Sequence, residues 1–438
     1  MARVAFIQSA YREQFGIMYL SAMLKQAGHG VEVFICNDST SKILMCKNIS
    51  AFDIIGFSSS TPTYKDDLYL ANCINMILPN KHIIFGGSHP TFYPDAVIKE
   101  NCINSICIGE GYEAIVECAN GDRREIYKPR EKYDINKLPM PDYELYYKKY
   151  PLLAKKSTKQ VYIVHNCPYD CAFCWNGAYR KLYNNDKKVY CMNVDKAIKE
   201  IKWLKDNYGF KWLQFISDNM TVNKKWIKEF LTKLKQEIDI PYLMNIRCNE
   251  INQEIVDLFE TTGCDRVDFG LEHGNDEIRN DVLKRNMSKS QITTAGRMLN
   301  KAGIRIQTSN MVGIPTDTVK KSIETIKLNQ MFKVEIAKCC IFQPFKGTDL
   351  YENYKSELQN MDINTGTTIQ IGYDGRGAIT KVKLKDEKKL VRLSYLFDFF
   401  VQNKWLNIFI PLIVSLPFDK YFRMYYNNKL KRQERKYI

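Results

Sequence analysis

Along the first 125 residues, short apolar runs alternate with longer amphipathic runs. The apolar runs suit buried strands and occur at 3–8, 31–36, 53–57, 82–85 and 105–108. The run at 16–27 has helical spacing instead, and Gly28 and Gly30 follow it as a stop signal. Strands that alternate with helices predict βαβ units and a parallel sheet. We therefore expect residues 1–125 to form a five-stranded, doubly wound, Rossmann-like (flavodoxin-like) α/β domain.

A second alternating region follows a polar stretch in which Pro139 and Pro141 break regular structure. Residues 126–155 are therefore expected to form a linker. The strand candidates of the second region are 160–165, 212–217, 242–247, 266–272, 305–313 and 335–342. Helical runs such as 224–237, 250–262 and 289–302 separate these strands. Six βα repeats predict an open or partial barrel over 156–348.

The remaining residues, 349–438, are expected to form a mixed, mainly helical C-terminal cap. They are rich in aromatic side chains: Tyr395, Phe397, Phe399, Phe400, Trp405, Phe409, Phe418, Tyr421, Phe422, Tyr425 and Tyr426. Basic residues follow at Lys429, Lys431, Arg432, Arg435 and Lys436. We expect the apolar face to pack on the barrel mouth. The alternative is an interfacial helix on a membrane surface, which would point to a lipid or lipid-linked substrate.

Composition and charge narrow the class of protein. The chain has 438 residues, of which 45% are hydrophobic and 26% charged, as in ordinary globular proteins. No signal peptide is apparent, and the apolar stretch 408–418 is shorter than the ~18–20 residues that span a bilayer. We therefore expect a cytoplasmic protein, with peripheral contact to the inner face of the membrane as the open alternative. The net charge of +15 fits an anionic partner or simply a lysine-rich proteome, and nucleic acid is not favoured.

The strongest chemical signal is a cysteine motif directly after the first strand of the second region. The segment HNCPYDCAFCWNG places Cys167, Cys171 and Cys174 in a C-x3-C-x2-C spacing. Three thiolates can hold three irons of a [4Fe–4S] cubane and leave the fourth iron open, whereas a ferredoxin supplies four cysteines. The open iron can then bind the amino and carboxylate groups of an amino acid. The alternatives are a zinc site with His165 as fourth ligand and unligated core thiols.

Fourteen cysteines in an apparently intracellular chain indicate reduced thiols or metal ligation and not disulfides. The other eleven, including Cys339 and Cys340, are expected to be small buried hydrophobes.

This motif resembles that of the radical S-adenosylmethionine (SAM) superfamily, in which an aromatic residue, here Phe173, precedes the last cysteine. The resemblance implies a partial (β/α)6 barrel, in agreement with the strand count. It also implies that the open iron binds the methionine part of SAM. One-electron reduction, from a donor such as flavodoxin or ferredoxin, then releases a 5′-deoxyadenosyl radical that abstracts hydrogen from the substrate.

The resemblance extends to further segments between about 160 and 350. The resemblance implies SAM contacts at Phe173, Asp218, Arg247, Glu272, Asn310 and Gly313. Asp218–Asn219 departs from the Gly-Gly-Glu-like motif of the family, and His273 replaces the usual serine of the Gly-x-Glu-Ser-Gly motif. The segment 342–351 resembles the part that closes the barrel.

The first region resembles the cobalamin-binding domain that precedes many radical SAM barrels. The matching segments are 16–34, 53–61, 83–98 and 106–117, with the connector 138–142. The expected cobalamin contacts lie at the carboxyl ends of strands: Ser58, Ser59, Thr61, Gly86, Gly87, His89, Gly109 and Glu110. Small residues let a large flat ligand approach the backbone, although they also make good βα turns. The Asp-x-His-x-x-Gly loop that supplies a cobalt ligand is absent, and His89 is expected to shape its loop.

With cobalamin bound, the resemblance implies transfer of a methyl group from methylcobalamin to a carbon of a small-molecule or lipid-linked substrate, and a second SAM then remethylates the cofactor. A cobalamin-dependent radical cyclase or rearrangement enzyme is one alternative. A methylthiotransferase is another, but Cys36, Cys46, Cys73, Cys102, Cys107 and Cys118 do not stand in its pattern of three further cysteines. A non-catalytic zinc module that binds RNA is the third.

Overall fold

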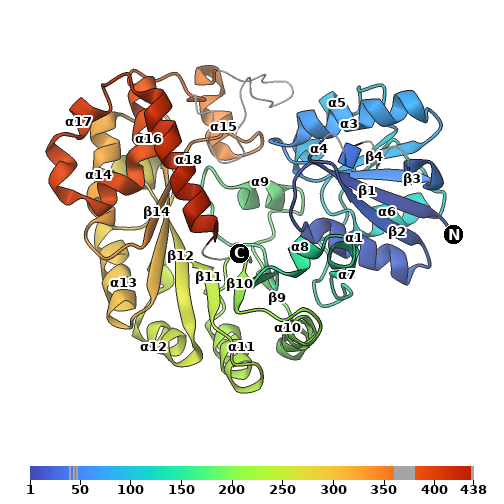
Figure 1. Cartoon of the computed structure of the whole chain (residues 1–438), viewed down its shortest axis with the longest axis horizontal. Coiled ribbons are helices and arrows are strands. Elements are labelled where there is room, and N and C mark those ends of the chain that lie inside the picture. The colour runs from blue at the N-terminus through green and yellow to red at the C-terminus, as the bar shows by residue number, and fades with distance from the viewer. Residues whose placement is uncertain (39–40, 43–44, 46–47, 360–379, 436–438) are drawn as a thin grey trace. The chain divides into compact units, whose positions relative to one another are not determined.

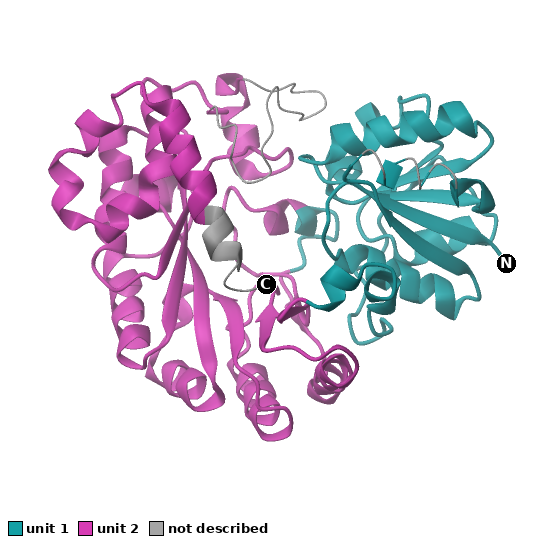
Figure 2. Cartoon of the chain, viewed as in Figure 1, with its two compact units in different colours: residues 1–155, 179–186, 361–369 teal, residues 156–178, 187–360, 370–438 magenta. Residues whose placement is uncertain are grey.

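The computed structural model describes residues 1–435 except 39–40, 43–44, 46–47 and 360–379, and describes side chains as far as Lys429 (Figure 1). The described residues divide into two compact units (Figure 2). The first comprises residues 1–155 and 179–186, and the second comprises the remaining described residues.

The first unit is built on a parallel sheet with strand order β2-β1-β3-β4-β5-β6. The strands are β1 (Arg3–Gln8), β2 (Gly30–Ile35), β3 (Ile54–Ser58), β4 (His82–Gly86), β5 (Ser105–Cys107) and β6 (Ile126–Tyr127). The helices of this unit include α1 (Phe15–Gln26), α3 (Tyr64–Ile77), α4 (Ser88–Phe92), α5 (Pro94–Val97) and α6 (Tyr112–Ala119). The doubly wound α/β fold is confirmed, but the sheet has a sixth strand beyond the five that we expected.

The segment expected to be a linker belongs to the first unit. It contains β6, α7 (Glu144–Tyr147) and α8 (Pro151–Ala154). The Tyr146 hydroxyl donates a hydrogen bond to Gln8 Oε1 at 2.6 Å, and Lys25 pairs with Asp142 at 2.6 Å. The hydroxyl of Tyr150 accepts from the Ile35 backbone N–H. These side chains fasten residues 126–155 to the sheet, so the segment is part of the domain and not a free connector.

The second unit is built on a parallel sheet with strand order β7-β10-β11-β12-β13-β14. The strands are β7 (Thr158–Val161), β10 (Trp212–Phe215), β11 (Tyr242–Ile246), β12 (Cys264–Glu272), β13 (Arg305–Val312) and β14 (Ile336–Ile341). The connecting helices are α10 (Val194–Tyr208), α11 (Lys224–Glu237), α12 (Gln253–Thr262), α13 (Lys289–Lys301) and α14 (Val319–Asn329). This arrangement confirms the predicted partial (β/α)6 barrel.

Side-chain caps begin each of these five helices. The capping residues are Asn193, Asn223, Asn252, Ser288 and Thr318, and each accepts from a backbone N–H of the first turn. Such caps satisfy amide groups that lack a partner inside the helix. The first predicted strand breaks after Val161, and β8 (Val164–His165) pairs antiparallel with β9 (Tyr190–Cys191). The break redirects the chain into the cysteine segment.

The described C-terminal region is mainly helical, with α15 (Asp349–Tyr354), α16 (Glu387–Gln402), α17 (Ile410–Ile413) and α18 (Asp419–Arg435). Helix α16 buries Leu393, Phe397 and Phe400 and packs along β14 and α14. Asp398 Oδ1 accepts the backbone N–H of Ala337 on β14 at 2.7 Å. The helix therefore covers the edge strand of the sheet, where open backbone groups need a partner. None of the described helices is both long and apolar enough to cross a bilayer.

Candidate active site

The three motif cysteines line one cavity of about 280 Å³ in the second unit. Strand ends and loops supply its other lining residues: Tyr169, Phe173, Asn176, Asp218, Asn219, Asn245, Ile246, Arg247, Asp268, Gly270, Glu272, Arg285 and Ser309. These residues come from the carboxyl side of β10 to β13 and from the cysteine segment. Ligands of parallel sheets bind at this side of the strands.

Asp218 holds the start of the cysteine segment in place. Its Oδ2 accepts the backbone N–H of Asn166 at 2.7 Å and the hydroxyl of Tyr162 at 2.9 Å. Asn166 has a φ of 72°, a left-handed conformation that asparagine tolerates better than most residues, and its side chain donates to the carbonyl of Lys188. The turn delivers Cys167 into the cavity. Asp218 therefore positions the loop in addition to lining the cavity.

Two guanidinium groups converge on Cys171. Arg247 donates to the Cys171 sulfur at 3.3 Å and Arg285 donates at 3.4 Å. The Arg247 guanidinium also lies 3.8 Å from the ring centroid of Tyr169 and donates to the carbonyl of Arg285. Both arginines are buried. A pair of cations beside one sulfur suits a thiolate and not a neutral thiol.

Burial works against charge on the other thiols. It raises the pKa of Cys167, and it raises the pKa of Cys174 to about 12, with the neighbouring motif cysteines adding to both shifts. Three crowded, desolvated thiols become thiolates only when a cationic group binds them. The donor set therefore fits an iron–sulfur cluster, since ferric and ferrous ions supply that charge. Among the described residues, no three His, Cys, Asp or Glu side chains stand ready to hold a single metal ion.

Glu272 ends β12 in an unusual backbone conformation. Its φ is 64°, and the pairing of β12 with β13 shifts register between Gly270 and Glu272. The carboxylate folds back to where a side chain on residue 270 would start, so a larger residue at position 270 would displace it. Burial raises the pKa of Glu272, although Arg285 and Arg247 act in the opposite direction. A strained, buried carboxylate in a ligand-sized cavity is a typical functional arrangement.

The structure brings four of the six predicted SAM contacts to this cavity: Phe173, Asp218, Arg247 and Glu272. The other two are not among its lining residues. Asn310 is buried, donates to Lys338 and accepts from Asn329. Gly313 has a φ of 75° and donates its N–H to Asp317 at 2.9 Å. These contacts tie Asn310 to β14 and α14, and they tie Gly313 to the loop after β13.

His273, which replaces the serine of the family motif, belongs to the same supporting layer. Its Nε2 lies 3.3 Å from Asp317 Oδ1, and both side chains are fully buried. Since Asp317 also accepts from Gly313, His273 links the loop after β12 to the loop after β13. It therefore lies behind the cavity wall.

Several lining residues escaped the sequence analysis, and some carried a signal. Asn245 is the polar residue of the otherwise apolar strand β11, a pattern that marks the polar face of a barrel strand, whereas Asp268 and Ser309 lie in strands that carry several polar residues. No pattern in the sequence marked Arg285 as a lining residue. It lies in the loop after the short helix Glu277–Val282, far from the cysteines in sequence.

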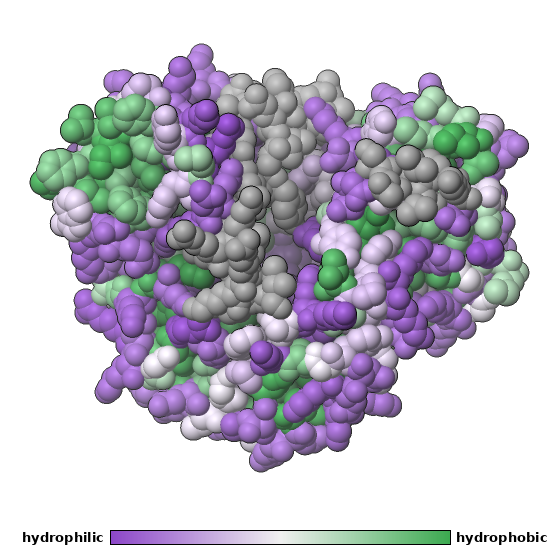
Figure 3. Space-filling view, in the orientation of Figure 1, coloured by the Kyte–Doolittle hydropathy of each residue, from purple (hydrophilic) through white to green (hydrophobic). Residues whose placement is uncertain are grey.

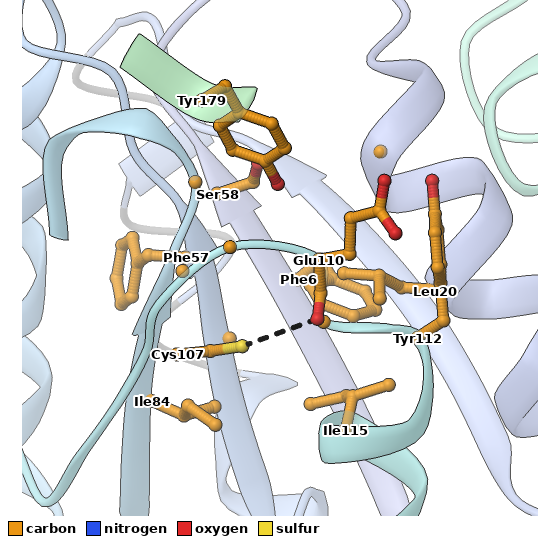
Figure 4. A pocket seen from close by; sticks show the side chains of 16 residues that line it. Phe6, Leu20, Phe57, Ser58, Ile84, Cys107, Glu110, Tyr112, Ile115 and Tyr179 are labelled. Carbon is orange, nitrogen blue, oxygen red and sulfur yellow. Dashed lines mark hydrogen bonds between the residues drawn. The ribbon is translucent and has the colours of Figure 1, made fainter. Parts of the chain in front are cut away.

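The first unit contains a second cavity, of about 200 Å³ (Figure 4). Six glycines contribute to its wall: Gly16, Gly56, Gly86, Gly87, Gly109 and Gly111. Phe6, Leu20, Ile84 and Ile115 give it an apolar floor, and Tyr179 is part of its wall. A narrow apolar slot between glycine backbones suits an insertion of a flat aromatic group, such as the benzimidazole of cobalamin.

Local backbone geometry explains part of this slot. Gly87 has a φ of 93°, and a Cβ there would lie 2.6 Å from the carbonyl oxygen of Ser59, so the position requires glycine. The backbone N–H of Glu110 donates to the Tyr183 hydroxyl at 2.8 Å, and the Glu110 carboxylate accepts from the Tyr133 N–H. Burial raises the pKa of Glu110. These contacts fix the loop between β5 and α6.

Five of the eight predicted cobalamin contacts line this cavity: Ser58, Gly86, Gly87, Glu110 and Gly109. Ser59, Thr61 and His89 do not. His89 is fully buried, stacks on Tyr64 and Tyr93 at centroid distances of 3.9 and 4.9 Å, and meets Thr61 Oγ1 at 3.1 Å. Burial lowers the pKa of His89 to about 3. His89 therefore packs in the core of the first unit, and its assignment as a cobalamin contact stays a prediction.

Comparison with known protein families matches both units. The model of the radical SAM superfamily matches residues 161–328, and the model of the B12 binding domain matches residues 11–119. The chain contains a radical SAM domain preceded by a B12 binding domain. Its cofactors are a [4Fe–4S] cluster, SAM and cobalamin, and the zinc-module alternative has no support in these matches.

Known relatives extend the likeness over most of the chain. An uncharacterized methyltransferase from Pyrococcus horikoshii is 26% identical, over 89% of this chain and 88% of the relative. An anaerobic magnesium-protoporphyrin IX monomethyl ester cyclase from Rubrivivax gelatinosus is 23% identical, over 79% and 67%. The structure of the cobalamin-dependent radical SAM enzyme OxsB has a TM-score of 0.70 and 14% identity, over 99% of this chain and 71% of OxsB. The last likeness shows a shared fold.

Proposed function

We propose that this protein is a cobalamin-dependent radical SAM C-methyltransferase that acts on a small-molecule or lipid-linked substrate. The main support for the proposal is that one chain contains two cavities with different linings. One is lined by the three motif thiols and two arginines, and the other by glycines and apolar side chains. The named activity of the Pyrococcus relative supports methyl transfer over other cobalamin chemistry.

In this proposal, Cys167, Cys171 and Cys174 hold the cluster, and Arg247 and Arg285 neutralise its charge at Cys171. Glu272, Asp268 and Ser309 provide polar groups for the amine and ribose hydroxyls of SAM, and Phe173 provides an apolar surface. Asn310, Gly313 and His273 support the loops from behind.

On the cobalamin side, Ser58, Gly86, Gly87, Gly109 and Glu110 form the wall of the binding slot. Ser59, Thr61 and His89 stabilise the loops that carry those residues. Because His89 is buried between two tyrosines, we propose that this protein offers cobalt no histidine ligand from that position.

When bound, the cluster with SAM supplies a hydrogen-abstracting radical and cobalamin supplies a methyl group. The side chains of the protein bind and orient these groups and keep water from the reactive carbon. An external one-electron donor such as flavodoxin or ferredoxin must deliver the electron. We propose the reducing cytoplasm as the compartment in which this chemistry takes place.

The test separates the two cofactor sites. Protein reconstituted anaerobically with iron, sulfide and cobalamin is reduced and given SAM. We expect 5′-deoxyadenosine from SAM cleavage at the cluster and S-adenosylhomocysteine from methylation of cobalamin by SAM. Cys171→Ala should abolish 5′-deoxyadenosine, because it removes one of three cluster ligands, and should leave cobalamin binding unchanged, because it does not touch the B12 unit. Full 5′-deoxyadenosine formation by Cys171→Ala would refute the cluster site.

The Rubrivivax relative supports radical ring closure as the second candidate. The two candidates differ in the fate of the methyl group. With SAM carrying a deuterated methyl group and a pool of candidate substrates, a methyltransferase produces a labelled carbon product. A cyclase consumes SAM and leaves the label out of its product.

A further inference from the structure

The segment around α17 is apolar on its buried side and on its exposed side. From Trp405 to Phe418 the sequence contains no charged residue. Leu406, Ile410 and Val414 point into the protein and are buried. The opposite side is exposed, with Trp405 at 71%, Ile408 at 79% and Leu412 at 63%. Phe409, Leu416, Phe418 and Tyr421 extend it, and Figure 3 shows a hydrophobic surface where Figure 1 places α17. We call these seven residues the apolar platform.

The apolar platform is held firmly on the second unit. Arg392 of α16 donates to the carbonyls of Val414 and Ser415 at 3.2 Å and pairs with Asp419 at 2.9 Å. Gln330, directly after α14, exchanges hydrogen bonds with Asn407. Several anchors therefore fix the segment in a shape that exposes large side chains. An exposed contiguous apolar patch of this kind marks a contact with a partner or a membrane.

Basic residues flank the apolar platform. Lys404 precedes it, Lys420 and Arg423 lie on either side of its last residue, Tyr421, and all three are exposed. From Lys404 to the C-terminus the sequence has eight basic residues and two acidic ones, and one of the two, Asp419, is paired with Arg392. Tryptophan, tyrosine and aliphatic side chains bordered by lysine and arginine are typical of segments that lie at the surface of an anionic bilayer.

The same charges argue against a second copy as the occupant. In a twofold dimer the same patch faces itself, so the flanking cations of both chains would gather around one apolar interface. Such like-charge contacts disfavour association. An anionic lipid surface has the opposite charge and accepts the aromatic side chains.

We propose that the apolar platform docks this protein on an anionic membrane surface, with its side chains in the boundary between headgroups and acyl chains and with no segment crossing the bilayer. This goes beyond the proposed methyl transfer and does not depend on it. It gives the catalytic unit access to substrates that partition into the membrane, and it favours the lipid-linked over the freely diffusing class.

The test measures flotation of the full-length protein with vesicles of phosphatidylcholine alone and of phosphatidylcholine mixed with phosphatidylglycerol. We expect the protein to float with the mixed vesicles and much less with the neutral ones, and high salt should weaken the binding. Trp405→Ser/Ile408→Ser/Leu412→Ser should lower the affinity at least tenfold, because it removes three exposed apolar side chains and leaves the anchored inner side intact.

The matched control replaces equally exposed apolar residues of the first unit, Met76→Ser/Ile77→Ser/Leu152→Ser, and should float as the wild type does. The proposal is overturned if the wild type floats with neither vesicle, or if the two triple variants bind equally. It is also overturned if the wild type is a dimer, only the platform variant is monomeric, and neither protein binds vesicles. None of these results bears on SAM cleavage, which is measured separately.

Discussion

At the residue scale, the unequal surroundings of the three cysteines have the clearest consequence. Arg247 and Arg285 both donate to Cys171, whereas Cys174 is buried among groups that raise its pKa to about 12. Hydrogen bonds and positive charge at cluster sulfurs stabilise the reduced state. The two arginines should therefore make the cluster easier to reduce.

Arg285→Met should accordingly shift the reduction potential of the cluster to a more negative value. We expect the ratio of reduced to oxidised cluster at a fixed solution potential to fall about tenfold, which corresponds to about 59 mV for one electron. Redox titration followed by electron paramagnetic resonance, without SAM, measures the shift on the cluster itself.

Arg305→Met is the matched control for Arg285→Met. Arg305 pairs with Asp265 and Glu335 at the amino end of β13, so the variant loses the same charge away from the cysteines. Its potential should stay close to that of the wild type. Equal potentials in wild type and Arg285→Met, with weaker SAM binding in the variant, would assign Arg285 to SAM alone.

A second residue-scale consequence concerns acid stability. Burial lowers the pKa of His89 to about 3, and an unfolded histidine titrates near 6.5. Between these values the unfolded state binds the extra proton, so the first unit loses stability as pH falls below about 6.5. Burial raises the pKa of Asp67 to about 6, so Asp67 makes the first unit more stable as pH falls below about 6.

His89→Phe keeps the ring between Tyr64 and Tyr93 but cannot titrate. Between pH 7.5 and pH 5, we expect the wild type to lose on the order of 2 kcal/mol more opening free energy than the variant. Amide hydrogen exchange of β3 and β4 reports on this unit alone. Asp67 is present in both proteins, so its contribution to the pH dependence cancels in the comparison. Parallel pH profiles of the two proteins would show that His89 is not buried in its neutral form.

At the scale of elements, the glycine-lined slot depends on residues without side chains. A Cβ on Gly86 would meet only the Cβ of Cys107, at 3.7 Å, so the backbone tolerates a side chain there. Gly86→Val places its methyl groups at the cavity wall. We expect at least a tenfold loss of cobalamin affinity, measured by the absorbance of the bound cofactor. The cluster content should not change.

Gly30→Val on β2 is the matched control for Gly86→Val, since Gly30 has similar room beside Arg3 and lies outside the slot. It should bind cobalamin as the wild type does. Undiminished binding by Gly86→Val would mean that cobalamin enters elsewhere.

Element by element, the sequence predicted most of the fold because the strands are strong apolar runs and the helices are capped and amphipathic. It missed β6, since Ile126–Tyr127 is too short to show a pattern. It misassigned 126–155 because its ties to the sheet, such as Tyr146 to Gln8, are tertiary contacts. The same reason hid Arg285, whose partner Cys171 lies 114 positions away.

At the scale of the whole molecule, the cysteine spacing and the order of βα loops were enough to predict both cofactor-binding units. Asn310, Gly313 and His89 do not line the two cavities, and motif position does not reveal which side of a loop faces the ligand. Lys436 of the basic tail and Cys46 lie outside the described residues. The exposed apolar platform, which composition alone left undecided, is visible only after folding.

The central claim is that one chain holds both a [4Fe–4S] cluster and cobalamin. The most direct measurement is iron and cobalt analysis of protein prepared anaerobically with cobalamin supplied. The account predicts about four irons and one cobalt per chain in the wild type, loss of iron alone in Cys171→Ala and loss of cobalt alone in Gly86→Val. Zinc in place of iron would contradict it.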